Sequence, residues 1–160
     1  MALQQHIVID DAKKPRTIGE AEAKNLGVWI EHTEMPNGER RFRLKHADGT
    51  AYIRTEATDK SGWQKSHFHK SVRETYIIQV GKVALAEWIN EQLRVRLFCT
   101  DELFTTERHV PHNIYMFPNA IIHTVKHGTE GKVIDWHATP FLDEKTRCLS
   151  EEDIERLAGK

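Results

Sequence analysis

Two histidines and a glutamate near the middle of the chain have the types and the spacing of metal ligands. His67 and His69 lie two residues apart, so on a β-strand both imidazoles point to the same face. Glu74 follows five residues later, which leaves room for the chain to turn and return on a neighbouring strand. A further histidine, His123, opens a second apolar segment. Three imidazoles and one carboxylate suit a divalent ion such as iron, manganese, nickel or zinc.

The same residues resemble the first motif of the cupin superfamily. That motif consists of a glycine, a His-x-His pair, a glutamate and a second glycine. The matching residues here are Gly62, His67, His69, Glu74 and Gly81. The gap after Gly62 is one residue shorter than in the family, which affects a turn rather than a ligand.

The second cupin motif is matched less completely. Pro118 and His123 match it strictly, whereas His112, Ala120 and His127 stand where the family has glycine, glycine and asparagine. These departures also fall on turns rather than on ligand positions. The resemblance implies a single divalent metal ion, and its implied ligands are His67, His69, Glu74 and His123.

The resemblance also implies an all-β fold, the cupin double-stranded β-helix or jelly-roll barrel, as one domain over residues 1–160. The core is expected at about 28–142, after an N-terminal arm at 1–27 and before a short C-terminal helix at 150–158. Short apolar segments separated by turn signals agree with this fold. Strands are predicted at residues 7–9, 28–34, 40–46, 52–58, 65–69, 74–80, 82–89, 93–98, 115–117, 121–126 and 132–137, with one helical turn at 20–25.

The size and composition favour a small-molecule protein in a reducing compartment. The chain has 160 residues and a formal charge of −1, so it lacks the basic surplus of nucleic-acid binders. Arg40, Arg41 and Arg43 form a dense basic patch, to be read either as a solvated strand or as a contact for an anionic ligand. No signal peptide or membrane span is visible, and Cys99 and Cys148 form no paired motif. We expect a cytoplasmic homodimer, paired through sheet edges, that binds neither nucleic acid nor membrane.

Strand alternation suggests which side chains share the cavity with the metal. Lys65 has the parity of His67, and Tyr76 has that of Glu74, so both are predicted as catalytic residues. Tyr76 could donate a proton, and Lys65 could bind an anion or act as a base. Each is also consistent with ordinary packing or a solvated surface. No second metal site is expected from His109, His112, His127 and His137, which lie in turns or at strand ends.

The fold alone does not choose a reaction. The leading hypothesis is a metal-dependent enzyme acting on a small polar metabolite, with a lean toward iron-type dioxygenase chemistry because the cavity is expected to be apolar and aromatic. One alternative is a metal-dependent sugar or sugar-phosphate isomerase, in which the ion acts as a Lewis acid. Another is a cupin that binds a metal or small ligand without turnover.

Overall fold

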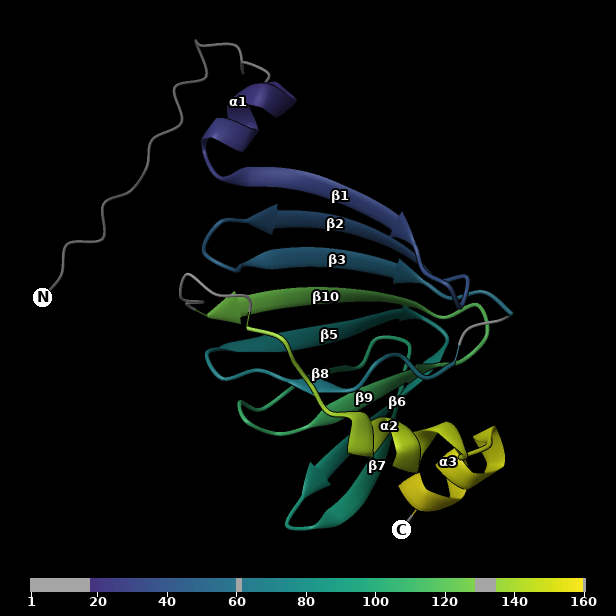
Figure 1. The fold of residues 1–160 in the computed structure, drawn as a ribbon. Helices are drawn as coiled ribbons and strands as arrows, with labels where there is room; N and C mark the ends of the chain where they lie inside the picture. The colour runs from purple at the N-terminus through teal and green to yellow at the C-terminus, as the bar shows by residue number, and fades with distance from the viewer. Residues whose placement is uncertain (1–17, 60–61, 129–134, 160) are drawn as a thin grey trace, which may run out of the picture.

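The computed structural model describes residues 18–59, 62–128 and 135–159. Nearly half of them belong to antiparallel strands, with one short helix before the first strand and two after the last (Figure 1). The elements in chain order are α1 (Glu20–Asn25), β1 (Val28–Glu34), β2 (Arg40–His46), β3 (Ala51–Glu56), β4 (His67–Phe68), β5 (Val72–Val80), β6 (Lys82–Ile89), β7 (Gln92–Cys99), β8 (Leu103–Thr105), β9 (His112–Met116), β10 (Ile121–Gly128), β11 (His137–Ala138), α2 (Pro140–Arg147) and α3 (Glu151–Ala158).

The strands form two sheets that face each other. The six-stranded sheet has the order β1-β2-β3-β10-β5-β8, and the five-stranded sheet has the order β11-β4-β9-β6-β7. From β3 to β11 the chain changes sheet at every step except from β6 to β7, as in a jelly roll. In Figure 1 the strands of the six-stranded sheet follow one another from β1 at the top down to β8. The predicted all-β jelly-roll fold is confirmed.

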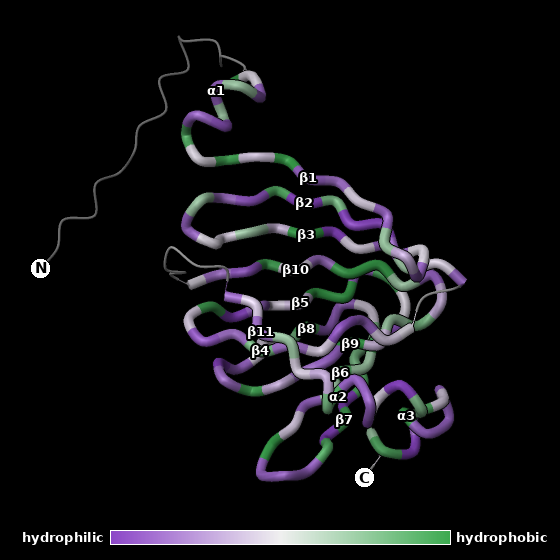
Figure 2. The backbone as a smooth tube through the Cα atoms, viewed as in Figure 1, coloured by the Kyte–Doolittle hydropathy of each residue, from purple (hydrophilic) through white to green (hydrophobic). Residues whose placement is uncertain are grey.

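Apolar side chains from both sheets form the core between them. Tyr76 and Ile78 on β5 and Ile122 on β10 meet Leu85 on β6 and Ile114 on β9, and all five are almost fully buried. The hydrophobic stretches along β5 and β10 are visible in Figure 2. Buried polar side chains also lie between the sheets, among them Glu74, which accepts a hydrogen bond from Tyr76 of this core.

The first hairpin places charged residues on the inner face of the six-stranded sheet. The Asn37-Gly38 turn connects β1 to β2, and Gly38 has a φ of 87°, a conformation that glycine adopts without strain. The pairing of Glu34 with Arg40 then fixes the register of the two strands. Because a strand alternates its faces, this register determines which basic residues of β2 point inward.

The C-terminal helices cover the outer side of the five-stranded sheet. Ser150 caps α3 in a capping box with Asp153, as its position before three acidic residues predicts. Ile154 of α3 is fully buried against a cluster that includes Ala84 and Val95. None of the helices in the described ranges is long and apolar enough to cross a membrane.

Several predicted elements coincide with the structure, and others do not. The predicted strands 28–34, 40–46 and 82–89 match β1, β2 and β6, and the helix predicted at 150–158 corresponds to α3. The sequence did not reveal α2 or β8, and β9 begins at His112, three residues before the predicted strand at 115–117. The strand predicted at 7–9 and the first half of the one predicted at 132–137 lie outside the described residues.

Candidate metal centre

Four side chains converge between the two sheets. His67 lies on β4, His69 follows that strand, and His112 begins β9, so all three imidazoles come from the side of the five-stranded sheet. Glu74 on β5 faces them from the six-stranded sheet. One ligand atom of each residue lies within 4.8 Å of the others. We call these four residues the donor cluster.

The imidazoles of the donor cluster turn their Nε2 atoms toward the Glu74 carboxylate. The distances from Nε2 to the carboxylate oxygen are 3.4 Å for His67, 3.5 Å for His69 and 3.5 Å for His112. His67 and His112 lie directly opposite each other in the antiparallel pairing of β4 with β9. The carboxylate and three imidazoles therefore surround one point, as the ligands of a mononuclear metal site do.

Backbone carbonyls fix the tautomer of each imidazole. Nδ1 of His67 lies 3.1 Å from the Lys65 carbonyl, and Nδ1 of His112 lies 3.0 Å from the Val110 carbonyl. Nδ1 of His69 contacts the Asp135 carbonyl. A carbonyl can only accept a hydrogen bond, so each Nδ1 carries the proton and each Nε2 presents its lone pair to the cluster. Metal-binding histidines are oriented in this way.

The donor cluster fits a divalent metal ion. Nε2 of His67, His69 and His112 is buried, and none of the three has a hydrogen-bond partner among the described residues. Leaving a buried polar atom unpaired costs roughly 1–3 kcal/mol. Three such atoms aimed at one carboxylate are explained by a cation that all of them would contact. The cluster is therefore a candidate site for a divalent metal whose identity the donor set leaves open.

The protonation states of the donor cluster suit metal binding. Burial would raise the pKa of Glu74, but the imidazoles of His112, His67 and His69 beside its carboxylate more than offset this effect and hold the pKa well below its usual value. Burial lowers the pKa of His67, against the opposing effect of Glu74. The carboxylate is thus ionised and the His67 ring neutral at neutral pH, which are the forms that bind metals.

Asp135 supports the donor cluster from behind. Its carboxylate accepts hydrogen bonds from the backbone N–H groups of Lys70 (2.8 Å), Ser71 (2.6 Å) and Val72 (3.0 Å). Burial would raise the pKa of Asp135, yet these N–H groups lower it below the usual range. The turn between His69 and Glu74 is fixed in this way, while the Asp135 carbonyl orients His69.

The prediction that His123 joins the cluster is wrong. On β10 the buried residues are Ile122 and Thr124, so His123 points to the outer face of the six-stranded sheet. Its Nδ1 lies 2.7 Å from the Tyr52 hydroxyl and its Nε2 lies 2.8 Å from Oε1 of Gln79. Both ring nitrogens therefore already have partners. Apolar residues occupy both faces of β10, so alternation could not show which face is buried.

His112 takes the place that the sequence assigned to His123. The sequence does contain a signal for the inward position of His112. His112, Ile114 and Met116 occupy every second position of β9, and all three are buried. The predicted strand began only at Tyr115, so this shared parity was missed. His112 was considered only as part of a second metal site, and the structure places it in the donor cluster with His67, His69 and Glu74.

The two predicted catalytic residues have different surroundings. Tyr76 is buried, and its hydroxyl donates a 2.7 Å hydrogen bond to Glu74 Oε2. Burial and the Glu74 charge raise the pKa of Tyr76 well above its usual value, so the phenol keeps its proton. Lys65 is exposed, because β4 begins only at His67 and the alternation does not extend back to residue 65.

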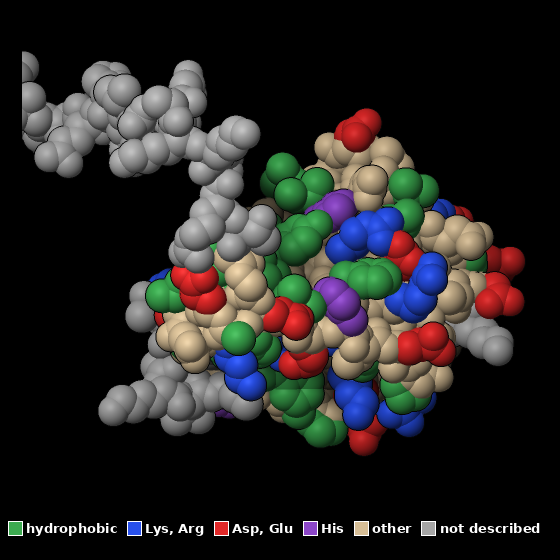
Figure 3. Space-filling model, turned by 90° about the horizontal axis from the view of Figure 1, so that it is seen from above, with side chains coloured by type: hydrophobic (Ala, Val, Ile, Leu, Met, Phe, Trp, Pro, Cys, Tyr) green, Lys and Arg blue, Asp and Glu red, His purple; other side chains and the backbone are tan. Residues whose placement is uncertain are grey.

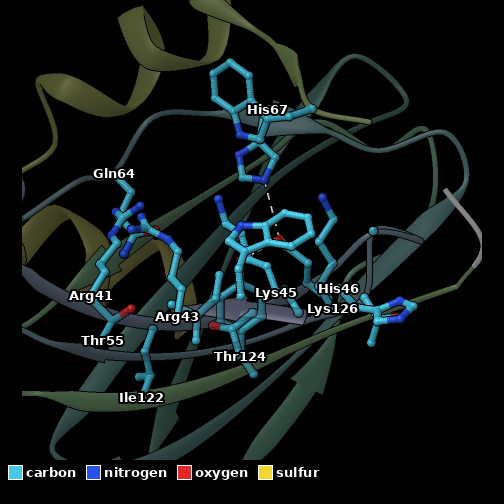
Figure 4. A pocket seen from close by; sticks show the side chains of 18 of the residues that line it. Arg41, Arg43, Lys45, His46, Thr55, Gln64, His67, Ile122, Thr124 and Lys126 are labelled. Atoms are coloured by element: carbon cyan, nitrogen blue, oxygen red, sulfur yellow. Dashed lines mark hydrogen bonds and ion pairs between the residues drawn. The ribbon is translucent and has the colours of Figure 1, made fainter. Parts of the chain in front are cut away.

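A cavity of about 450 Å³ opens from the donor cluster across the inner face of the six-stranded sheet. His67, Glu74 and Tyr76 line one side of it. The remaining lining is more charged than the sequence suggested. In Figure 4 four cationic side chains rise from the sheet toward the side on which His67 lies, and these are Arg41, Arg43, Lys45 and Lys126.

A second cavity of about 320 Å³ adjoins the first on the side of His67. The two share Arg41, Gln64, His67 and Trp136 among their lining residues. The Trp136 indole is 41% exposed and stacks on the His67 imidazole, with ring centroids 5.3 Å apart. Trp136 therefore shields the His67 side of the cluster from water.

Comparisons with known proteins identify the fold. No protein-family model and no curated protein sequence matches the chain. KdgF from Halomonas sp. superposes with a TM-score of 0.50 at 11% identity, over 62% of this chain and 87% of KdgF. The cupin domain of Drosophila melanogaster CENP-C gives 0.51 at 10% identity, over 71% and 86%.

Oxalate decarboxylase from Bacillus subtilis, a protein with Mn(II) centres, gives a TM-score of 0.56 at 13% identity. The match covers 82% of this chain and 38% of the decarboxylase, so this chain spans well under half of that protein's length. These similarities establish that the chain has the cupin fold. They do not select a reaction, because this fold carries different functions.

Proposed function

We propose that this protein is a metal-dependent cupin enzyme that acts on a small polar metabolite. The observation that carries the proposal is the donor cluster, in which one carboxylate and three imidazole nitrogens without a partner in the described part of the chain lie at the end of a cavity. His67 and Glu74 line that cavity, so a ligand could reach the metal position. Four protein ligands would leave room on a bound ion for substrate, which distinguishes a catalytic site from a structural one.

Proton-transfer chemistry of the isomerase type suits this cavity best. When bound, a divalent cation polarises carbonyl and hydroxyl oxygens and makes a neighbouring C–H more acidic. Among the residues of the chain, Tyr76 is suited to hold the proton: its phenol is protonated, lines the cavity and lies one hydrogen bond from Glu74. Polar groups such as Thr55 and Thr124 line the same space and would bind substrate hydroxyls.

Oxidative chemistry of the iron-dioxygenase type is the second candidate. Ile53, Ile122, Trp29 and Trp136 line the cavity and would exclude water from a reactive intermediate. The lean toward oxygen chemistry in the sequence analysis depended on a cavity that is mainly apolar. Four cations in the lining make the cavity less apolar than expected, so we favour proton transfer over oxidative chemistry.

Metal analysis followed by activity assays tests the proposal. The protein is purified without added ions, its metal content is measured, and a panel of sugars, sugar acids and keto acids is assayed with an oxygen electrode and by chromatography. Turnover without oxygen uptake is expected. Substrate-dependent oxygen consumption by an iron-containing protein would favour the second candidate. Tight ligand binding without turnover of any panel member would favour a binding protein.

A variant separates the roles of Tyr76. Tyr76→Phe removes the proton but keeps the ring that packs against Phe104, with centroids 4.9 Å apart. If Tyr76 moves a proton, kcat falls by about two to four orders of magnitude while the metal is retained. If Tyr76 only positions Glu74, turnover changes no more than metal affinity does.

A further inference from the structure

The geometry points to a subsite for an anionic group, a carboxylate or phosphate, at the side of the cavity opposite the donor cluster. Its residues are Arg41, Arg43 and Lys45, which we call the basic row, with Lys126 between the row and the cluster. The inference rests on the proposed function and deepens it. The substrate would carry an anionic group in addition to the oxygens that face the metal.

The basic row is a consequence of strand alternation. Arg41, Arg43 and Lys45 occupy every second position of β2, and all three line the cavity. Residues of the opposite parity, such as Arg40, lie on the outer face of the sheet. Figure 4 shows Arg41 and Arg43 extending from the sheet toward Gln64, and Lys45 rising beside Lys126. Three cations in one register therefore form one wall of the cavity.

The neighbouring strand leaves room in front of this wall. In the sheet register Lys45 pairs with Ala51, Ala51 pairs with Lys126, and Lys126 pairs with Glu74. Strands lie about 4.8 Å apart, so the backbone of Lys45 is about 14 Å from that of Glu74. Ala51 lies between Lys45 and Lys126 and lines the cavity, and its short side chain leaves space above the sheet at that point. A metabolite of a few carbon atoms would fit between the metal position and the basic row.

The charges of the cavity favour an anion. Two carboxylates face the basic row: Glu39 lies 2.7 Å from Arg41, and Glu31 lies 2.6 Å from Lys45 and 3.5 Å from Arg43. Glu31 is 43% exposed at the rim, where water screens it. With Lys126 there are four cations, and with the ionised Glu74 of the donor cluster there are three carboxylates, so the balance is positive by one charge before any metal ion is counted.

Two members of the basic row are held in place before any ligand arrives. The fully buried Glu39 accepts hydrogen bonds from Arg41 Nε (3.1 Å) and Nη2 (2.7 Å), and also from Gln64 Nε2 (3.2 Å). The Arg43 side chain is only 12% exposed. Burial and the nearby Arg41 lower the pKa of Arg43, but a guanidinium remains charged at neutral pH. Such preorganised cations bind anions with little loss of side-chain entropy.

The confinement of these cations argues for a small molecule rather than a macromolecule. A space of about 450 Å³ is in the range of metabolite sites. The face seen in Figure 3 intersperses lysine and arginine with aspartate and glutamate rather than presenting a continuous basic surface. The net charge of −1 agrees with this.

Calorimetry on the metal-loaded protein with two probes tests the subsite. Gluconate can bind a metal through its carboxylate and hydroxyl, and 6-phosphogluconate adds a distant phosphate. We expect the parent protein to bind 6-phosphogluconate at least about tenfold more tightly than gluconate. In Arg43→Gln that advantage should shrink to about twofold or less, while metal content and gluconate affinity stay unchanged.

Arg40→Gln is the matched control, because it removes the same charge from the outer face of the same strand, where Arg40 pairs with Glu56. It should leave the phosphate advantage intact. If Arg43→Gln does not fold, Lys45→Gln replaces it, with the same expected loss. Equal affinity of the parent for the two probes, no binding of either, or equal effects of Arg40→Gln and Arg43→Gln would overturn the subsite.

The test also separates this inference from the proposed function. A protein that holds no metal but binds 6-phosphogluconate through Arg43 would retain the anion subsite and contradict the metal-dependent enzyme. A metal-loaded protein without any preference for the added phosphate would be compatible with the metal-dependent enzyme and would contradict the anion subsite.

Discussion

The donor cluster and the outer histidine His123 use the same side chain in opposite ways. In the cluster each imidazole has one nitrogen against a backbone carbonyl and the other without a partner among the described residues. His123 has side-chain partners on both nitrogens, namely Tyr52 and Gln79. A histidine of this second kind is satisfied without a ligand. The partners of the ring nitrogens, rather than the position in a motif, therefore distinguish a metal ligand from a structural histidine.

The largest expected effect comes from removing a cluster imidazole. His69→Ala or His112→Ala should weaken metal binding at least about 100-fold, because loss of an outer-shell partner alone costs roughly 10–100-fold. His123→Ala is the control and should keep its metal. Metal stoichiometry, with circular dichroism to confirm folding, measures this. Loss of metal in His123→Ala would make His123 a ligand, and retention of metal in His112→Ala would exclude His112 as one.

Removal of the support behind the cluster should have the next largest effect. Asp135→Asn loses a charge that three backbone N–H groups stabilise, so the free energy of unfolding should fall by about 2–3 kcal/mol at neutral pH. The pKa of Asp135 is lower in the folded protein, so its contribution is present above the unfolded pKa and is lost as the pH falls through the folded pKa. Urea unfolding of both proteins between pH 7 and about pH 3 should therefore show the difference narrowing in acid. A constant difference would contradict this role.

A smaller effect is expected from changing the charge of the carboxylate. Glu74→Gln keeps an amide oxygen but removes the negative charge, so metal affinity should fall by roughly tenfold, or about 1.4 kcal/mol. Competition with a chelator measures the change. Equal affinity of variant and parent would mean that Glu74 acts as a base or supports the imidazoles instead of binding the metal.

The smallest effect on the metal is expected for Tyr76→Phe. The Glu74 charge remains and only one hydrogen bond is lost, so metal affinity should fall about three- to fivefold. The same chelator competition applies, with Phe104→Leu as a control that alters the packing of the Tyr76 ring but not its hydroxyl. A loss as large as that of His112→Ala would show that Tyr76 holds the carboxylate in place almost alone.

The parts of the fold that could be predicted from the sequence are those with local signals. The Asn37-Gly38 turn and the alternation beside it define β1 and β2, and Ser150 with its acidic neighbours defines α3. The three residues of β8 carry no such signal, because Leu103 and Thr105 are outside and only Phe104 packs inside. Its existence depends on pairing with β5, which is a tertiary interaction.

The candidate site was predictable where spacing fixes the geometry. His67, His69 and Glu74 belong to one short segment, and the structure brings them together. The fourth residue comes from a distant strand, and its identity depends on which face of β9 or β10 lies against the core. His112 and His123 both sit near apolar strands, so only the packing of the two sheets decides between them. The inward basic row of β2 was equally undetermined, because both faces of that strand carry arginine.

The division of the donor cluster between two sheets has a consequence for the order of folding. Three imidazoles come from one layer and the carboxylate from the other, so the complete ligand set does not exist until the layers have docked. We therefore expect a newly made chain to acquire its ion late, after the barrel closes. Once bound, the ion would link side chains of both sheets and slow the separation of the two layers.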